Sequence, residues 1–141
     1  MLTPISQRPR FPYYWRVTKV RFRDLTGDGL PEIVWELFTS GGTGSSPSLK
    51  GVDRWNGQSA ARVFRFHNVD RKPPPDFEYV IGVSWRIVGA VDGGLAEIET
   101  SESLHRSDDG TCCPSAYRVT RHRWDGTTIA PVSGSETIED Q

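Results

Sequence analysis

Apolar and polar residues alternate along several short stretches of the chain, which is the pattern of β-strands with one buried face. These stretches are rich in β-branched and aromatic residues, and Gly, Pro, Asn and Asp gather between them. No window keeps the repeat of about 3.6 residues that marks an amphipathic helix. The pattern predicts eight strands, at about 14–24, 32–39, 51–55, 60–66, 78–91, 95–103, 116–124 and 127–132.

Three consecutive prolines separate the first four predicted strands from the last four. They lie in the segment 71–76, and because proline has no N–H to donate to a sheet, we expect a stiff extended connector there. The residues after the last strand, 133–141, are expected to form a flexible tail. We therefore predict one domain over 1–141, with a first β unit at 14–66 and a second at 78–132.

The two halves resemble each other in sequence. Residues 28–33 (Asp-Gly-Leu-Pro-Glu-Ile) resemble 93–98 (Gly-Gly-Leu-Ala-Glu-Ile), and residues 54–57 (Arg-Trp-Asn-Gly) resemble 123–126 (Arg-Trp-Asp-Gly). Asn-Gly and Asp-Gly favour two-residue hairpins, since both central positions of the turn take positive φ. We expect an all-β fold of about eight antiparallel strands in two related four-stranded halves, arising by internal duplication. The halves would form a compact sandwich or a barrel-like single domain.

Oxygen-bearing side chains alternate with other residues in the segment 24–32, between the first two predicted strands. Calcium prefers six to eight oxygen ligands at about 2.3–2.6 Å, and alternate residues of a curled loop can converge on one ion. Gly27 and Gly29 would supply the curl, because they accept positive φ. The expected ligands are four side chains and one main-chain carbonyl, from Asp24, Thr26, Asp28, Leu30 (carbonyl) and Glu32.

The flanking sequence excludes an EF-hand, which would need Glu where Trp35 stands and a helix on each side. The segment instead resembles the calcium loop of FG-GAP/VCBS repeats of integrin-α-like β-propellers, D-x-[DN]-x-D-G-x-x-[DE] between two strands. Thr26 departs from the usual Asp or Asn. The resemblance implies Ca²⁺ as the cofactor, although eight strands are too few for a propeller. A glycine-rich turn with solvated acids is the open alternative.

The corresponding positions in the second half have lost most of their oxygen donors. They are Gly89, Val91, Gly93 and Glu97, of which Glu97 alone carries a carboxylate. We therefore expect no metal in the second half.

The charge distribution is uneven, although the net charge is only -1. Residues 1–23 contain six Arg or Lys and no acid, so this basic, aromatic end could contact nucleic acid or a membrane surface. A simpler explanation of these basic residues is a strand whose Arg and Lys side chains face solvent or pair with the acidic remainder of the chain. No nucleic-acid-binding motif is present in the sequence. Nucleic acid is disfavoured, other partners are unknown, and no apolar run predicts a transmembrane segment.

The two cysteines of the chain, Cys112 and Cys113, are neighbours. Ordinary disulfides join Cα atoms about 4.4–6.8 Å apart, whereas adjacent Cα atoms are about 3.8 Å apart, so a bond between them closes a strained ring. Residue chemistry alone leaves four alternatives open: reduced thiols, pairing between chains, a soft-metal site and the strained ring.

The segment 108–126 contains Asp-Asp-Gly-Thr-Cys-Cys-Pro-Ser and resembles the CCPS segment of poorly characterised exported proteins of high-GC Gram-positive bacteria. The resemblance implies a secreted or cell-surface protein in an oxidising compartment, where we expect a vicinal disulfide between Cys112 and Cys113. Pro114 restricts Cys113 to extended conformations, which favours the ring. Met-Leu-Thr-Pro at the start has no apolar signal core, so a trimmed leader is expected, and a cytoplasmic location stays open.

No catalytic constellation stands out in the sequence. Ser45 and Ser46 lack the elbow of a hydrolase nucleophile. The scattered His67, His105 and His122 are expected at the surface or half-buried, and the carboxylates of Glu97, Glu99 and Glu102 on a solvated face. The sequence favours an exported non-enzymatic calcium-binding module that presents loops for binding or scaffolding. The alternative is a small hydrolase or carbohydrate-active accessory protein with a site assembled from loops.

Overall fold

The computed structural model of the protein describes residues 14–40, 48–67, 71–90 and 92–141. Ser45 and Ser46, and residues 1–13 of the basic N-terminal end, lie outside the described residues. Every regular element in the described ranges is a β-strand, so the all-β prediction is confirmed.

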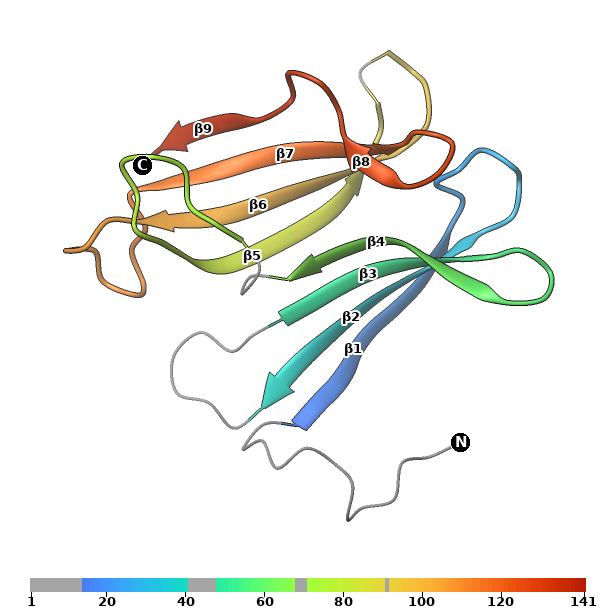
Figure 1. Ribbon diagram of the computed structural model, residues 1–141, viewed down its shortest axis with the longest axis horizontal. Helices are drawn as coiled ribbons and strands as arrows, with labels where there is room; N and C mark the ends of the chain where they lie inside the picture. The colour runs from blue at the N-terminus through green and yellow to red at the C-terminus, as the bar shows by residue number, and fades with distance from the viewer. Residues whose placement is uncertain (1–13, 41–47, 68–70, 91) are drawn as a thin grey trace.

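Nine strands form two antiparallel sheets in this part of the chain (Figure 1). The first sheet has the order β1-β2-β3-β4, with β1 (Tyr14–Arg23), β2 (Glu32–Ser40), β3 (Ser48–Trp55) and β4 (Ala60–His67). The second has the order β5-β6-β7-β8, with β5 (Tyr79–Val88), β6 (Glu97–His105), β7 (Ala116–Trp124) and β8 (Ile129–Pro131), and β9 (Thr137–Asp140) also pairs with β7. The arrangement is sandwich-like, and the barrel alternative is wrong because each sheet keeps open edges.

The β3–β4 and β7–β8 hairpins have the same turn. The side-chain oxygen of Asn56 accepts the N–H groups two and three residues further on, at 2.9 Å each, and Asp125 does the same at 2.8 Å each. The glycines that follow, Gly57 and Gly126, have φ of 98° and 104°. Because the side chain closes the turn, the loop is longer than the two residues that Asn-Gly and Asp-Gly predict.

Strand register is also equivalent in the two sheets. Ile33 lies opposite Asp53 across β2 and β3, and Ile98 lies opposite His122 across β6 and β7. The sequence matches between the halves align these two pairs with each other. This equivalence is what a duplication would produce, and the duplication itself stays a prediction.

The C-terminal segment forms β9, whereas the sequence predicts a flexible tail. β8 ends at Pro131, the N–H of Val132 still donates to the carbonyl of Arg121 at 2.8 Å, and β9 then pairs with the other half of β7. Between them, the Ser135 hydroxyl accepts the N–H of Arg121 at 3.3 Å and donates to its carbonyl at 3.1 Å. One side chain thus bridges the gap along the edge of β7.

The segment 71–76 contains a tight turn as well as extended residues. The N–H of Phe77 donates to the carbonyl of Pro74 at 3.2 Å, and Asp76 has φ of 77°. In this four-residue turn Pro75 is the second residue, and Asp76, with positive φ, is the third. Both features are typical of a type II turn. The connector therefore bends just before β5.

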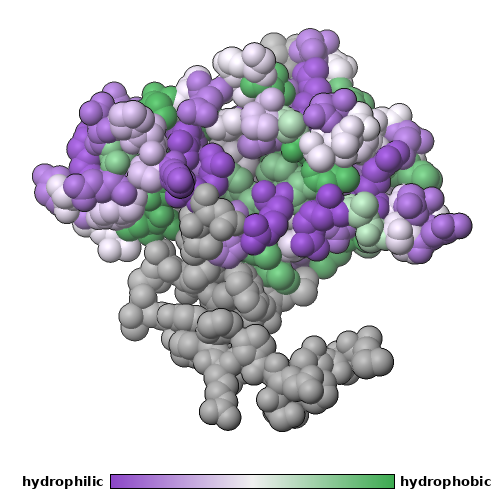
Figure 2. All heavy atoms as spheres, in the orientation of Figure 1, coloured by the Kyte–Doolittle hydropathy of each residue, from purple (hydrophilic) through white to green (hydrophobic). Residues whose placement is uncertain are grey.

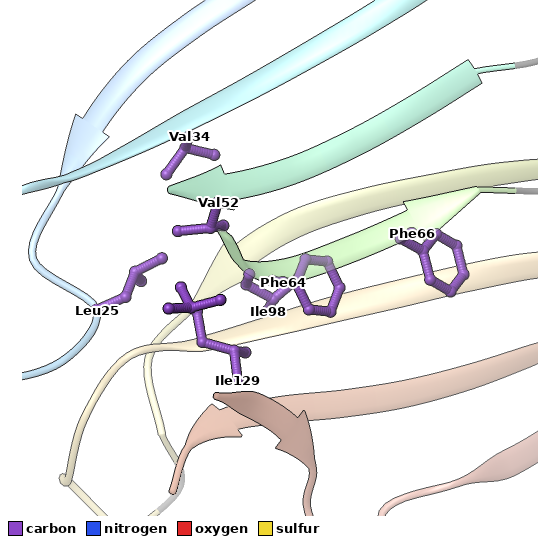
Figure 3. Packing of buried hydrophobic residues seen from close by; sticks show 8 residues of the cluster. Leu25, Val34, Val52, Phe64, Phe66, Ile98 and Ile129 are labelled. Atoms are coloured by element: carbon purple, nitrogen blue, oxygen red, sulfur yellow. The ribbon is translucent and has the colours of Figure 1, made fainter. Parts of the chain in front are cut away.

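The core lies where the sheets come together, near the β1–β2 loop and the two hairpins (Figures 1 and 3). Inward-facing residues of both sheets meet there, which holds the β1–β2 loop between them through Leu25. The buried cluster comprises Leu25, Val34, Val52, Val63, Phe64, Phe66, Ile98 and Ile129. Away from this end the sheets diverge (Figure 1), and buried polar residues such as Glu102 and His105 lie there among buried apolar ones such as Leu104.

Candidate metal centre

The segment between β1 and β2 is a tight loop organised by the carboxylate of Asp24. Its Oδ1 accepts the N–H groups of Thr26 at 3.2 Å and Gly27 at 2.8 Å, and its Oδ2 accepts the N–H of Gly29 at 2.8 Å. Gly27 and Gly29 have φ of 81° and 83°, which side chains resist. Both glycines therefore curl the loop.

Glu32 is the first residue of β2 and lies in the interior, with 1% of its surface exposed. Its Oε2 accepts the N–H of Leu25 at 2.6 Å, and its Oε1 accepts the hydroxyl of Thr26 at 2.8 Å. Among the described residues, no Lys, Arg or His side chain forms an ion pair with it. Glu32 is thus a buried carboxylate that accepts hydrogen bonds and pairs with none of the described cationic side chains.

The carboxylates of Asp24, Asp28 and Glu32 converge. One oxygen of each lies within 4.8 Å of the other two. Two oxygens that share one calcium at about 2.3–2.6 Å can be as far as roughly 5 Å apart, so this spacing fits a single ion. An oxygen that accepts one hydrogen bond keeps a lone pair for a cation. The three carboxylates are therefore spaced so that they could share one cation.

The other two predicted ligands are less directly placed. Thr26 lies against the cluster, because its hydroxyl donates to Glu32. The N–H of Leu30 donates to Asp28 Oδ1 at 2.9 Å, which ties Leu30 to the loop. Their coordination of an ion stays a prediction.

Arg54, on β3, is the one cationic side chain of the described residues that forms an ion pair with the cluster. Its Nη2 lies 3.2 Å from Asp28 Oδ2, and its guanidinium stacks over the ring of Trp124 at 5.1 Å. Hydrogen bonding from the N–H of Leu30, and then from Arg54, holds the pKa of the Asp28 carboxyl below its ordinary value. One positive charge thus faces three carboxylates.

The equivalent position in the second half is arranged differently. Glu97 begins β6 as Glu32 begins β2, and it is also buried. Arg123 donates from Nε to Glu97 Oε2 at 3.1 Å and contacts both oxygens of Asp92 at 3.2 Å, and Arg121 lies 3.5 Å from Glu97 Oε1. Arginine side chains here provide the positive charge that Glu32 lacks.

The two related loops touch each other. A Cβ added at Gly27 would lie 2.7 Å from Leu95 Cδ2, and Leu95 is the counterpart of Leu30 in the sequence match between the halves. Glycine at position 27 therefore lets the β1–β2 loop pack against the second half.

Comparison with protein-family models, curated proteins and solved structures gives no match to this chain. In the described part of the chain, no helix is long and apolar enough to cross a membrane.

Two glutamates predicted on a solvated face of the sixth strand are buried. Glu97 is held by the arginines described above, and Glu102, 1% exposed, accepts hydrogen bonds from Nε of Arg118 and Nε of Arg71. Arg118 lies directly opposite Glu102 across β6 and β7 and also donates to the carbonyl of Lys72 at 2.9 Å. The prediction was wrong because the arginine partners lie on other segments.

The three histidines are buried, whereas the sequence predicts surface or half-buried positions. His67, His105 and His122 are 7%, 1% and 7% exposed. His122 Nε2 lies 3.0 Å from the hydroxyl of Thr100. Burial, and secondarily the charge of Arg71, lowers the pKa of His122 to about 4, so its ring is neutral at physiological pH.

Cys112 and Cys113 form a vicinal disulfide in the exposed loop between β6 and β7, as predicted. The Asp109 carboxylate ties this loop together by accepting the N–H of Arg106 at 2.7 Å and the hydroxyl of Ser115 at 2.6 Å. These two bonds hold the pKa of Asp109 below its ordinary value. The Asp109 side chain therefore closes the loop, and the disulfide joins two neighbouring residues within it.

Proposed function

We propose that the protein is a non-enzymatic calcium-binding β module, in which one Ca²⁺ held by Asp24, Asp28 and Glu32 stabilises the β1–β2 loop. The observation that carries the proposal is the buried Glu32 carboxylate, which meets two further carboxylates and no cationic side chain among the described residues. A buried charge without a counter-charge is costly. A divalent cation would remove that cost.

The second half supports this interpretation. It carries the same buried glutamate at the same register position, and there Arg123 and Arg121 supply the counter-charge. In the first half the equivalent arginine, Arg54, extends to Asp28 and Trp124 instead. Calcium in the first half would neutralise the buried charge of Glu32, as arginine neutralises that of Glu97.

Calcium bound here would act as a structural clip. Asp24 and Asp28 lie in the loop, Glu32 begins β2, and Leu25 anchors the loop in the core. An ion bound by all three carboxylates would join the loop to the sheet, and the hydroxyl of Thr26 and the carbonyl of Leu30 would complete the shell. No step of a chemical reaction is assigned to the ion.

The wider proposal is an exported module whose loops present a binding surface. The vicinal disulfide is compatible with an oxidising compartment. Extracellular calcium is high enough to fill a site of modest affinity, which suits the resemblance to FG-GAP/VCBS loops. The buried histidines and paired glutamates favour a structural role over catalysis.

Thermal unfolding with and without calcium tests the proposal. A ligand that binds the folded state raises Tm as its concentration rises. We expect this rise for the native chain and for Glu97→Gln, and its loss in Glu32→Gln. Asp28→Asn, at an exposed position, repeats the test if Glu32→Gln folds poorly.

Magnesium provides the matched ion control, because it demands shorter bonds and octahedral geometry and should stabilise less. An unchanged Tm in millimolar calcium, or an equal response in the Asp28→Asn variant, would refute the site.

A further inference from the structure

A cavity of about 330 Å³ lies at one flank of the sandwich, between the first sheet and β5. It shares no residue with the calcium loop. The lining residues come from β1, β2, β3 and β5 and are Lys19, Arg21, Glu36, Lys50, Val83, Ser84, Trp85 and Arg86. Four of them are basic and one is acidic, so the cavity carries an excess of positive charge.

Lys50 is the buried member of this set. Its side chain is 4% exposed, and its Nζ lies 2.7 Å from Glu36 Oε1. It shares the inner face of β3 with Val52, next to the hydrophobic core. An ammonium group is costly to place there, and the ion pair with Glu36 offsets part of that cost. A buried charge beside a cavity is also a common feature of binding sites.

Glu36 lies between two lysines. It is paired in register with Lys19 on β1 and with Lys50 on β3. Burial raises the pKa of Glu36, but the hydrogen bond and charge of Lys50, with smaller contributions from Trp85 and Lys19, together leave the pKa below its ordinary value. Glu36 is therefore charged, and it is the one acidic residue beside the four basic residues of the lining.

The exposed cations at the entrance add to this excess. Lys19 and Arg21 are exposed, and among the described residues neither forms an ion pair with an acidic side chain. Arg86 lies 2.8 Å from Glu99, which is outside the lining, so its charge is balanced. The lining thus carries more positive than negative charge, from Lys19, Arg21 and Lys50 beside Glu36. This charge makes the cavity suited to an anion.

The β5 side of the cavity presents Val83 and Trp85 together with Ser84 and Arg86. Trp85 is half-buried, and its ring stacks on Phe64 at 6.0 Å between centroids. Val83 lies beside it on the inner face of β5. A rigid indole beside cationic groups suits a ligand with a flat or ring-shaped body and an acidic group.

We propose that this cavity binds a small organic anion, with its carboxylate at Lys19, Arg21 and Lys50 and its ring against Trp85. The class includes uronic acids and aromatic carboxylates. Hydrophilic and hydrophobic residues are intermixed on the face seen in Figure 2.

Titration calorimetry of the full chain with glucuronate and with benzoate tests the proposal. Glucose serves as the uncharged probe, at constant ionic strength and with a chelator present. The chelator separates this site from the calcium proposal, since either site can then fail alone. We expect heat from at least one of the two acids and none from glucose.

Variants locate the binding. Lys19→Gln combined with Arg21→Gln changes only exposed side chains and should weaken binding about tenfold or more, since charge-assisted hydrogen bonds are lost. Lys50→Met should abolish it. Lys72→Gln, an exposed control outside the cavity, should leave affinity within about twofold. The proposal is overturned if neither acid binds, if glucose binds equally well, or if the double variant and the control behave alike.

Discussion

Arg123 donates from Nε to Oε2 of Glu97 at 3.1 Å, at the point where β6 begins opposite the end of β7. The corresponding residues of the first half, Arg54 and Glu32, form no such bond. Arg54 instead pairs with Asp28 and stacks on Trp124. Two loops with related sequences thus neutralise a buried glutamate in different ways, and the calcium proposal rests on this difference.

The close contact between Gly51 and Trp35 predicts a strong effect of a small substitution. A Cβ at Gly51 would lie 2.1 Å from Trp35 Cζ2, because the indole lies across β3 at this point. We expect Gly51→Ala to lower the free energy of unfolding by about 1–3 kcal/mol, as overpacking does.

Urea denaturation of Gly51→Ala, Trp35→Leu and the double variant measures this effect. In the double variant the smaller leucine side chain at position 35 leaves room for the alanine methyl. The double variant should therefore lose less stability than the sum of the losses of the two single variants. Fully additive losses would contradict the steric explanation.

The buried ion pair of Glu102 and Arg118 predicts an asymmetric mutational response. Glu102→Leu leaves the guanidinium of Arg118, whose side chain is 8% exposed, without its carboxylate, and should lower the free energy of unfolding by about 3 kcal/mol or more. Combining Glu102→Leu with Arg118→Met removes both charges and should cost less than Glu102→Leu alone. Chemical denaturation of the two variants decides this, and a double variant that is less stable than the single one would contradict it.

His122 predicts a loss of stability in mild acid. Its pKa is about 4 in the folded protein, against 6.5 for the ordinary group, because burial disfavours the charged ring. Below pH 6.5 the unfolded state takes up a proton that the folded state does not, so stability falls until the pH reaches about 4. The total loss is at most about 3 kcal/mol.

Denaturation curves across this pH range compare the native chain with His122→Gln, whose amide can still meet the Thr100 hydroxyl. The variant should lose less stability on acidification, since Gln does not titrate. Equal pH dependence in both proteins would assign the effect to other groups.

The vicinal disulfide predicts a redox-sensitive mass and little change in stability. A mild dithiol reductant should add two hydrogens to the monomer. Replacing both Cys112 and Cys113 by Ser should change the free energy of unfolding by only about 1 kcal/mol, because a bond between neighbours closes almost no chain. Two free thiols in unreduced protein, or a much larger loss in the variant, would contradict this account.

The strands could be predicted because their signal is local. Alternation, β-branched residues and the Asn-Gly and Asp-Gly turns place the first eight strands within a few residues of their observed positions. β9 was missed because it pairs with the half of β7 that the short strand β8 does not cover. The sequence of the last residues alone does not indicate that the edge of β7 is available for pairing.

The loop residues of the candidate site could likewise be found from spacing alone, since ligands and glycines lie within nine residues of sequence. The burial of Glu32 and the role of Arg123 could not, because they depend on which segments meet across the sheets. A partial signal for Glu102 existed: it alternates with Ile98, Thr100 and Leu104 on the inner face of β6. The solvated-face interpretation overlooked that periodicity.

Calcium titration calorimetry measures the central claim most directly. The native chain should bind one Ca²⁺ at millimolar calcium or below, Asp24→Asn should bind none, and Glu97→Gln should bind like the native chain. This outcome would locate the ion in the β1–β2 loop. It would also indicate that the second half binds no calcium, because arginines neutralise its buried glutamate. Absence of binding heat at millimolar calcium, or equal binding by Asp24→Asn, would contradict the account.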